Sequence, residues 1–159
     1  MRSWPRERRL GRVHRDDPLL IDRIARVLRD GPALRVAMLF GSAARGQLHA
    51  DSDVDLGILP VDTDLPLRAE LDLQAALAQA CGRSVDLVRL DHATTVLKWR
   101  VLQEGRAIAP TSHADLVRFT RDSALEYAEF APALHRAEVA FQAKLRAGAT
   151  TERGPGNAA

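Results

Sequence analysis

Two short groups of residues in this chain are suited to phosphate and metal chemistry. Gly41 and Ser42 form a glycine–serine pair, and after ten intervening residues Asp53 and Asp55 flank a single valine. Glycine lets a backbone N–H approach a phosphate oxygen without a Cβ in between. Paired carboxylates attract a divalent cation. Together the two groups indicate transfer of a nucleotidyl group from a nucleoside triphosphate.

The glycine–serine turn is the phosphate-binding half of this hypothesis. The apolar run over 34–40 predicts a buried strand that ends at Gly41, with a helical turn directly after it. In that position Ser42 can donate its hydroxyl to a phosphate, and Arg45 can present its guanidinium one turn later. Glycine–serine pairs are common in turns, so this half of the hypothesis depends on the carboxylates beside it.

The carboxylates belong to the next predicted strand, over 53–59. Its alternation places Asp53 and Asp55 on one face, about 7 Å apart along the chain, and apolar residues on the other. Two adjacent anions repel each other, and a divalent cation removes that cost. Mg²⁺ suits this geometry because it combines a few carboxylates with phosphate oxygens and water. Two such ions ~4 Å apart can hold the attacking and leaving oxygens of an in-line displacement.

A third carboxylate is needed to receive the proton of the acceptor hydroxyl. Asp86 is the best candidate because it lies within an otherwise apolar predicted strand over 84–90, where aspartate is uncommon. Asp51 and Asp91 are alternatives, but both lie at strand ends, where a turn or a cap explains an aspartate. The metal-binding and catalytic set is therefore predicted to be Asp53, Asp55 and Asp86.

The rest of the pattern alternates helices with strands and predicts an α/β (α+β) domain with a helical C-terminal extension. The predicted helices cover 18–29, 67–81 and 94–104, and a short edge strand covers 106–109. The predicted boundaries are a basic leader over 1–16, a core over 17–110, a helical extension over 111–147 that Pro132 kinks or divides, and a disordered tail over 148–159.

The 159-residue chain has a net charge of only +2, but six arginines fall within its first fifteen residues. Two interpretations are open: a basic arm for RNA or an acidic partner, or a flexible leader without function. We favour the second, since no aromatic-rich surface accompanies the arm, and we expect no direct nucleic-acid binding. The arginines are Arg2, Arg6, Arg8, Arg9, Arg12 and Arg15.

Other features of the sequence restrict the function class. A single cysteine, Cys81, excludes an intramolecular disulfide and is expected to be a small core residue. No stretch approaches the ~20 apolar residues of a membrane span, so we expect a cytoplasmic protein that does not contact membranes. The five histidines show no zinc-site spacing.

These residues resemble the polymerase-β-like nucleotidyltransferases, and most closely the minimal nucleotidyltransferases that act as antitoxins in HEPN/MNT toxin–antitoxin pairs. The signature is Gly41-Ser42, ten residues, then Asp53-x-Asp55. The similarity continues through the segment around Asp86 and the residues after it, and covers about residues 18 to 110. The arginine-rich leader and Ala43, at a variable position, depart from the family pattern without touching the chemistry.

The resemblance implies a small mixed sheet with flanking helices. It implies that Asp53, Asp55 and Asp86 bind Mg²⁺ and catalyse, and that Gly41 and Ser42 hold the triphosphate of ATP. AMP would pass to a tyrosine hydroxyl of a HEPN ribonuclease toxin and silence it. Two alternatives stay open: an antitoxin that acts by binding alone, and a nucleotidyltransferase for small molecules such as aminoglycosides. The short chain counts against the latter because a second domain would be needed to enclose the acceptor.

Overall fold

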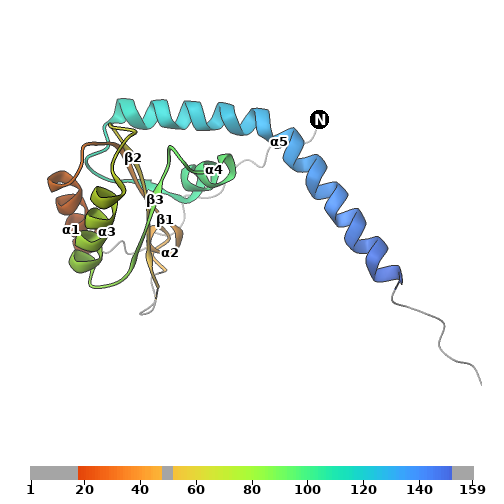
Figure 1. Cartoon of the computed structure of the whole chain (residues 1–159), viewed down its shortest axis with the longest axis horizontal. Helices are drawn as coiled ribbons and strands as arrows, with labels where there is room; N and C mark the ends of the chain where they lie inside the picture. The colour runs from red at the N-terminus through yellow and green to blue at the C-terminus, as the bar shows by residue number, and fades with distance from the viewer. Residues whose placement is uncertain (1–17, 48–51, 152–159) are drawn as a thin grey trace, which may run out of the picture.

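The computed structural model describes residues 18–47 and 52–151, so the predicted arginine-rich leader lies outside the described residues. Within them, the chain forms a mixed sheet with helices on both faces and a long helix that extends away from the body (Figure 1). This arrangement confirms the predicted fold class of a small mixed sheet, flanking helices and a helical C-terminal extension.

The described sheet has four strands in the order β3-β2-β1-β4. The central strand β1 (Leu34–Phe40) runs antiparallel to β2 (Val54–Pro60) on one side and to β4 (Arg106–Ala107) on the other. In contrast, β2 and β3 (Val85–Arg89) are parallel, which requires the crossover helix α3 (Leu67–Cys81) between them. The amino end of β2 and the carboxyl end of β1 therefore meet at one end of the sheet.

One face of the sheet is covered by α1 (Pro18–Asp30) and α3 (Figure 1). The predicted apolar stripe of α1 is buried at Ile24 and Leu28, where it packs against residues such as Leu56 of β2. Cys81 is buried at the end of α3, as expected of a small core residue. The helix then stops at Gly82, whose φ of 66° favours glycine.

The other face is covered by α4 (Thr95–Glu104) and the first half of α5 (His113–Thr151). Val101 and Phe119 are buried there against residues of β1. Trp99 of α4 stacks on Tyr127 of α5 with ring centroids 4.5 Å apart. These contacts fix the two helices to each other and to the sheet.

The helical extension departs from prediction at its end. The helix α5 continues to Thr151, so residues 148–151 of the predicted disordered tail are helical, while residues 152–159 lie outside the described residues. Gly148 costs only about 1 kcal/mol relative to alanine within a helix, and the alanine-rich sequence around it favours continuation. The predicted kink is visible as a bend in α5 (Figure 1), and Pro132 explains it by removing a backbone donor.

The edge strand is shorter than predicted, since β4 ends at Ala107 rather than at 109. The reason is the pairing of Ala37 in β1. Its carbonyl accepts from the Ile108 amide at 2.9 Å, while its own amide donates to the Thr111 hydroxyl at 2.7 Å. The threonine side chain thus takes the place that the strand backbone would occupy. No helix among the described residues is long and apolar enough to cross a membrane.

Candidate active site

Three predicted carboxylates come together where β2 and β3 run side by side. Asp55 and Asp86 are direct partners in the parallel register, and Asp53 precedes β2 on the same side of the chain as Asp55. Their neighbours Val54 and Val85 are also partners and are buried in the core, so the alternation of the strands presents the aspartates on the opposite face. Asp53 and Asp86 are exposed and Asp55 is half-buried.

Gly41 lies directly against the central carboxylate. Its φ is +66°, and a Cβ placed on it would lie 2.0 Å from Asp55 Oδ2 and 2.9 Å from Asp55 Cγ. The contact follows from the pairing of β1 with β2, because Phe40 is the antiparallel partner of Asp55. Two features therefore require a glycine at this position: its left-handed backbone and its close approach to a carboxylate.

The turn after Gly41 is short and closed by its own backbone. Gly41–Ala44 forms the single turn α2, with Gln47 N donating to Ser42 O at 2.9 Å. Ser42 is partly exposed and Arg45 follows as the C-terminal cap, one residue beyond the helical turn. Ser42 and Arg45 thus follow within four residues of the glycine that lies against the Asp55 carboxylate.

Electrostatics at the site favour a bound cation. Burial raises the pKa of the Asp55 carboxyl above its ordinary value, and the charges of Asp86 and Asp53 raise it further. Arg100 and Arg45 act in the opposite direction by stabilising the charged form. The two aspartate neighbours contribute to the same shift only if they lie near Asp55, so the shift itself reports a crowded cluster of negative charge.

The three aspartates suit a magnesium ion whose remaining ligands are water and phosphate oxygens. Carboxylate oxygens are ligands that Mg²⁺ prefers, and it commonly keeps waters and substrate phosphate oxygens as well. Among the described residues, no group of three or more histidine, cysteine, aspartate or glutamate side chains is arranged to hold a metal ion by itself. Asp53, Asp55 and Asp86 would accordingly supply only part of a coordination shell.

Two positively charged side chains, Arg45 and Arg100, act on the charge of Asp55, and Arg45 is the one that the sequence assigned to the nucleotide. Arg45 Nη1 contacts Glu104 Oε2 at 2.8 Å, and Arg100 Nε contacts the same oxygen at 3.5 Å. Arg100 lies on α4, outside the signature, so the spacing of the signature residues does not identify it. Its signals in the sequence are its place on the helix after Asp86, where it could approach a triphosphate although a solvated face is commoner, and the four-residue interval to Glu104, which is typical of a helical ion pair.

The alternative carboxylate Asp91 has a different role. Its two oxygens accept from Arg89 at 2.9 and 2.6 Å, and this bond lowers the pKa of Asp91 against the effect of burial. Arg89 is only 7% exposed and also reaches the Thr63 carbonyl at 3.0 Å. Asp91 therefore neutralises a buried arginine, while the other alternative, Asp51, lies outside the described residues.

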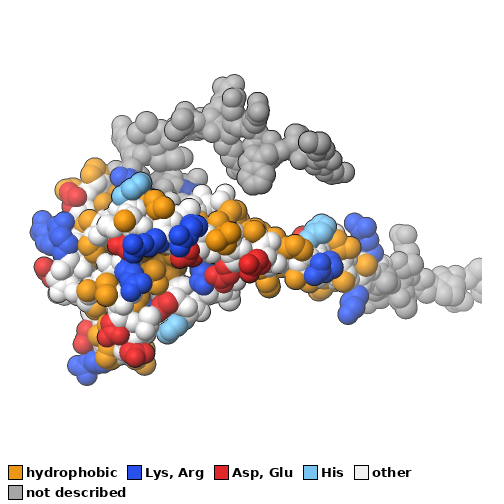
Figure 2. Space-filling model, turned by 90° about the horizontal axis from the view of Figure 1, so that it is seen from above, with side chains coloured by type: hydrophobic (Ala, Val, Ile, Leu, Met, Phe, Trp, Pro, Cys, Tyr) orange, Lys and Arg blue, Asp and Glu red, His pale blue; other side chains and the backbone are white. Residues whose placement is uncertain are grey.

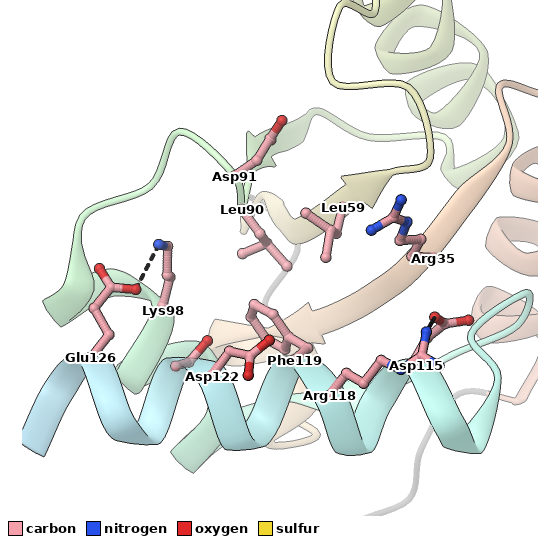
Figure 3. A pocket seen from close by; sticks show the side chains of 11 residues that line it. Arg35, Leu59, Leu90, Asp91, Lys98, Asp115, Arg118, Phe119, Asp122 and Glu126 are labelled. Carbon is pink, nitrogen blue, oxygen red and sulfur yellow. Dashed lines mark hydrogen bonds and ion pairs between the residues drawn. The ribbon is translucent and has the colours of Figure 1, made fainter.

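A cavity of about 210 Å³ lies at the other end of β1 and β2, beneath α5 (Figure 3). Charged side chains line it, but most are paired: Lys98 contacts Glu126 at 2.9 Å, and Arg118 contacts Asp115 at 4.0 Å. The cavity excludes the signature carboxylates. The Lys98–Glu126 pair joins α4 to α5, so we regard the cavity as a junction between elements rather than the reaction site.

A mixed sheet that holds a glycine–serine turn against a pair of aspartates defines the class of nucleotidyltransferase domains. Residues 22–114 match the family described as polymerase beta nucleotidyltransferase, and the chain belongs to this family. The match includes every residue of the signature.

Within this family, the chain is similar to proteins of toxin–antitoxin pairs. The chain is 39% identical over 95 residues to the protein adenylyltransferase MntA of Shewanella oneidensis, covering 59% of this chain and 68% of that protein. A toxin–antitoxin structure with AMP-PNP matches at a TM-score of 0.61 and 33% identity, covering 74% of this chain and 98% of the other. A complex of the tri-AMPylated Shewanella oneidensis HEPN toxin with its MNT antitoxin matches at 0.61 and 30%, covering 76% and 98%. The predicted resemblance to minimal nucleotidyltransferase antitoxins is confirmed.

Proposed function

We propose that this protein is an antitoxin that transfers AMP from ATP to a hydroxyl of a cognate HEPN ribonuclease toxin, with a tyrosine as the acceptor and Mg²⁺ as the cofactor. The observation that carries the proposal is the direct approach of Gly41 to Asp55, with Asp86 as the cross-strand partner of Asp55. It joins a phosphate-binding turn to a carboxylate cluster within one strand pair.

The proposed reaction is an in-line displacement at the α-phosphorus of ATP. The acceptor oxygen forms a bond to this phosphorus, and the bond to the β-phosphate oxygen breaks and releases pyrophosphate. Asp86 receives the proton of the acceptor hydroxyl, because it is exposed beside Asp55 on the face open to a substrate. The Gly41 turn, Ser42 and Arg45 orient the triphosphate. Mg²⁺, held by the three aspartates, would neutralise the phosphate charge and polarise the reacting oxygens.

A protein acceptor suits the surface of the extension. Beyond the body of the protein, α5 exposes apolar side chains at Val139, Phe141 and Leu145, with exposed fractions of 54–62%. Figure 2 shows hydrophobic side chains along this projecting helix, interspersed with lysine and arginine. We assign this distal half of α5 as a docking face for the toxin, since large exposed apolar patches mark protein partners. The similarity to an MNT antitoxin in complex with a HEPN toxin supports a toxin as the partner.

Transfer can be tested with ATP labelled at either end. Toxin incubated with this protein, Mg²⁺ and ATP labelled on the α-phosphate should gain label, whereas label on the γ-phosphate should leave as pyrophosphate. Asp53→Asn should abolish labelling, with Asp72→Asn on α3 as a matched control for the loss of one exposed carboxylate. Labelling from the γ-phosphate would contradict AMP transfer. A complex that forms without any labelling would instead support neutralisation by binding alone.

A further inference from the structure

A single carboxylate oxygen joins the two arginines at the edge of the site. Glu104 Oε2 contacts Arg45 Nη1 at 2.8 Å and Arg100 Nε at 3.5 Å. The two arginines come from α2's end and from α4, which are 55 residues apart in sequence. All three side chains are partly exposed, at 42%, 58% and 34% for Arg45, Arg100 and Glu104.

We propose that Glu104 occupies the position of a phosphate group between Arg45 and Arg100, and that these arginines bind the β- and γ-phosphates of the nucleotide when Glu104 releases them. The proposal rests on the proposed function and deepens it. It adds Arg100 as a phosphate ligand and makes Glu104 a competing anion that pairs with both guanidinium groups in the absence of nucleotide.

Geometry and charge both support this role. Glu104 Oε2 accepts a hydrogen bond from Arg45 and forms an ion pair with Arg100, so one anionic oxygen lies between two guanidinium groups, as a phosphate oxygen does in a site built from two arginines. Arg45 ends the α2 turn, whose first residue Gly41 lies against Asp55, and Glu104 contacts both Arg45 and Arg100, which places the arginine pair at the edge of the site. Without nucleotide, the carboxylate of Glu104 prevents the two arginines from repelling each other across the site.

The chain contains a matched control for this pair. Arg68 and Asp72 on α3 form another exposed ion pair at the same four-residue interval, at 3.2 Å. The helix α3 begins beyond the carboxyl end of β2, whereas the signature carboxylates lie at the amino end of that strand. Substitutions there remove equal charges without touching the site.

The test measures binding rather than transfer. Dissociation constants for ATP, AMP and inorganic tripolyphosphate are determined calorimetrically with the full-length protein. Arg100→Gln should weaken ATP and tripolyphosphate about tenfold and leave AMP within twofold, because a charge-assisted bond to the outer phosphates is lost. Glu104→Gln should tighten both polyphosphates about threefold, because the competing anion is gone. Arg68→Gln and Asp72→Asn should change neither.

The sign of the Glu104 effect separates this proposal from a structural one. If Glu104 only supported the fold, Glu104→Gln would weaken binding or leave it unchanged, and either result overturns the proposal. Equal weakening of ATP and AMP by Arg100→Gln would also overturn it. These results do not depend on the acceptor, so failure of AMP transfer to the toxin would be recognised separately, as transfer that is absent although ATP binds.

Discussion

The contact between Gly41 and Asp55 gives the most specific prediction, which concerns the substitution Gly41→Ala. An alanine Cβ would lie 2.0 Å from Asp55 Oδ2, far inside the ordinary contact distance of about 3.5 Å. The carboxylate must therefore move by more than an ångström, and a displacement of ~1 Å in a catalytic group can lower a rate about 100-fold. In addition, the left-handed backbone at φ +66° costs an alanine roughly 1–2 kcal/mol of stability.

Gly82→Ala is the matched control for backbone strain. Gly82 has the same φ of +66°, but a Cβ there would meet nothing within 4 Å. Both variants should therefore lose a similar 1–2 kcal/mol of unfolding free energy in urea denaturation. Only Gly41→Ala should lose kcat/KM for AMP transfer, by about 100-fold.

The comparison between the two alanine variants decides whether the reasoning holds. AMP transfer is measured at a temperature where both are folded, as verified by circular dichroism. A kcat/KM for Gly41→Ala within threefold of that for Gly82→Ala would refute the claim that Gly41 positions the metal-binding carboxylate.

Three further predictions concern charge and docking. The pKa of Asp55 is raised in the folded state, so its ionised form lowers stability at neutral pH. Metal-free Asp55→Asn should therefore melt a degree or two higher at pH 7, and the difference should disappear as pH falls below about 4. Thermal stabilisation by Mg²⁺ should likewise weaken with falling pH. Asp91→Asn should cost about 2 kcal/mol in urea denaturation, since buried Arg89 loses the nearer of two charged partners and keeps Glu70 at 3.7 Å; no loss would contradict this role. Phe141→Glu on α5 should weaken toxin binding at least tenfold without altering ATP binding, whereas Leu71→Glu should not, because Leu71 is a similarly exposed apolar residue on α3 (52% against 62%); unchanged toxin binding by Phe141→Glu would exclude the docking face.

Local sequence patterns predict the helices and strands well, because the conformation of each helix or strand depends largely on residues close together in the sequence. The alternation in β2 places Val54, Leu56 and Ile58 in the core, as expected from the period of a strand. The end of α3 at Gly82 follows from the preference of glycine for the left-handed cap. The predicted end of α5 is wrong, because Gly148 does not stop this alanine-rich helix.

Relationships between distant segments could not be predicted in this way. The cross-strand pairing of Asp55 with Asp86 depends on the register of two parallel strands, which no local pattern specifies. Likewise, the ion pair between Arg45 and Glu104 joins side chains 59 positions apart. The roles of the aspartates and of the glycine–serine turn stay predictions until the variants are measured.

Intact-mass spectrometry of the toxin tests the central claim most directly. The HEPN toxin of its Shewanella oneidensis relative is incubated with the full-length protein, ATP and Mg²⁺, in parallel with Asp53→Asn. We predict that the toxin gains the mass of one or more AMP groups, that fragmentation places them on tyrosine, and that Asp53→Asn adds none. A stable complex with a toxin of unchanged mass would contradict the account.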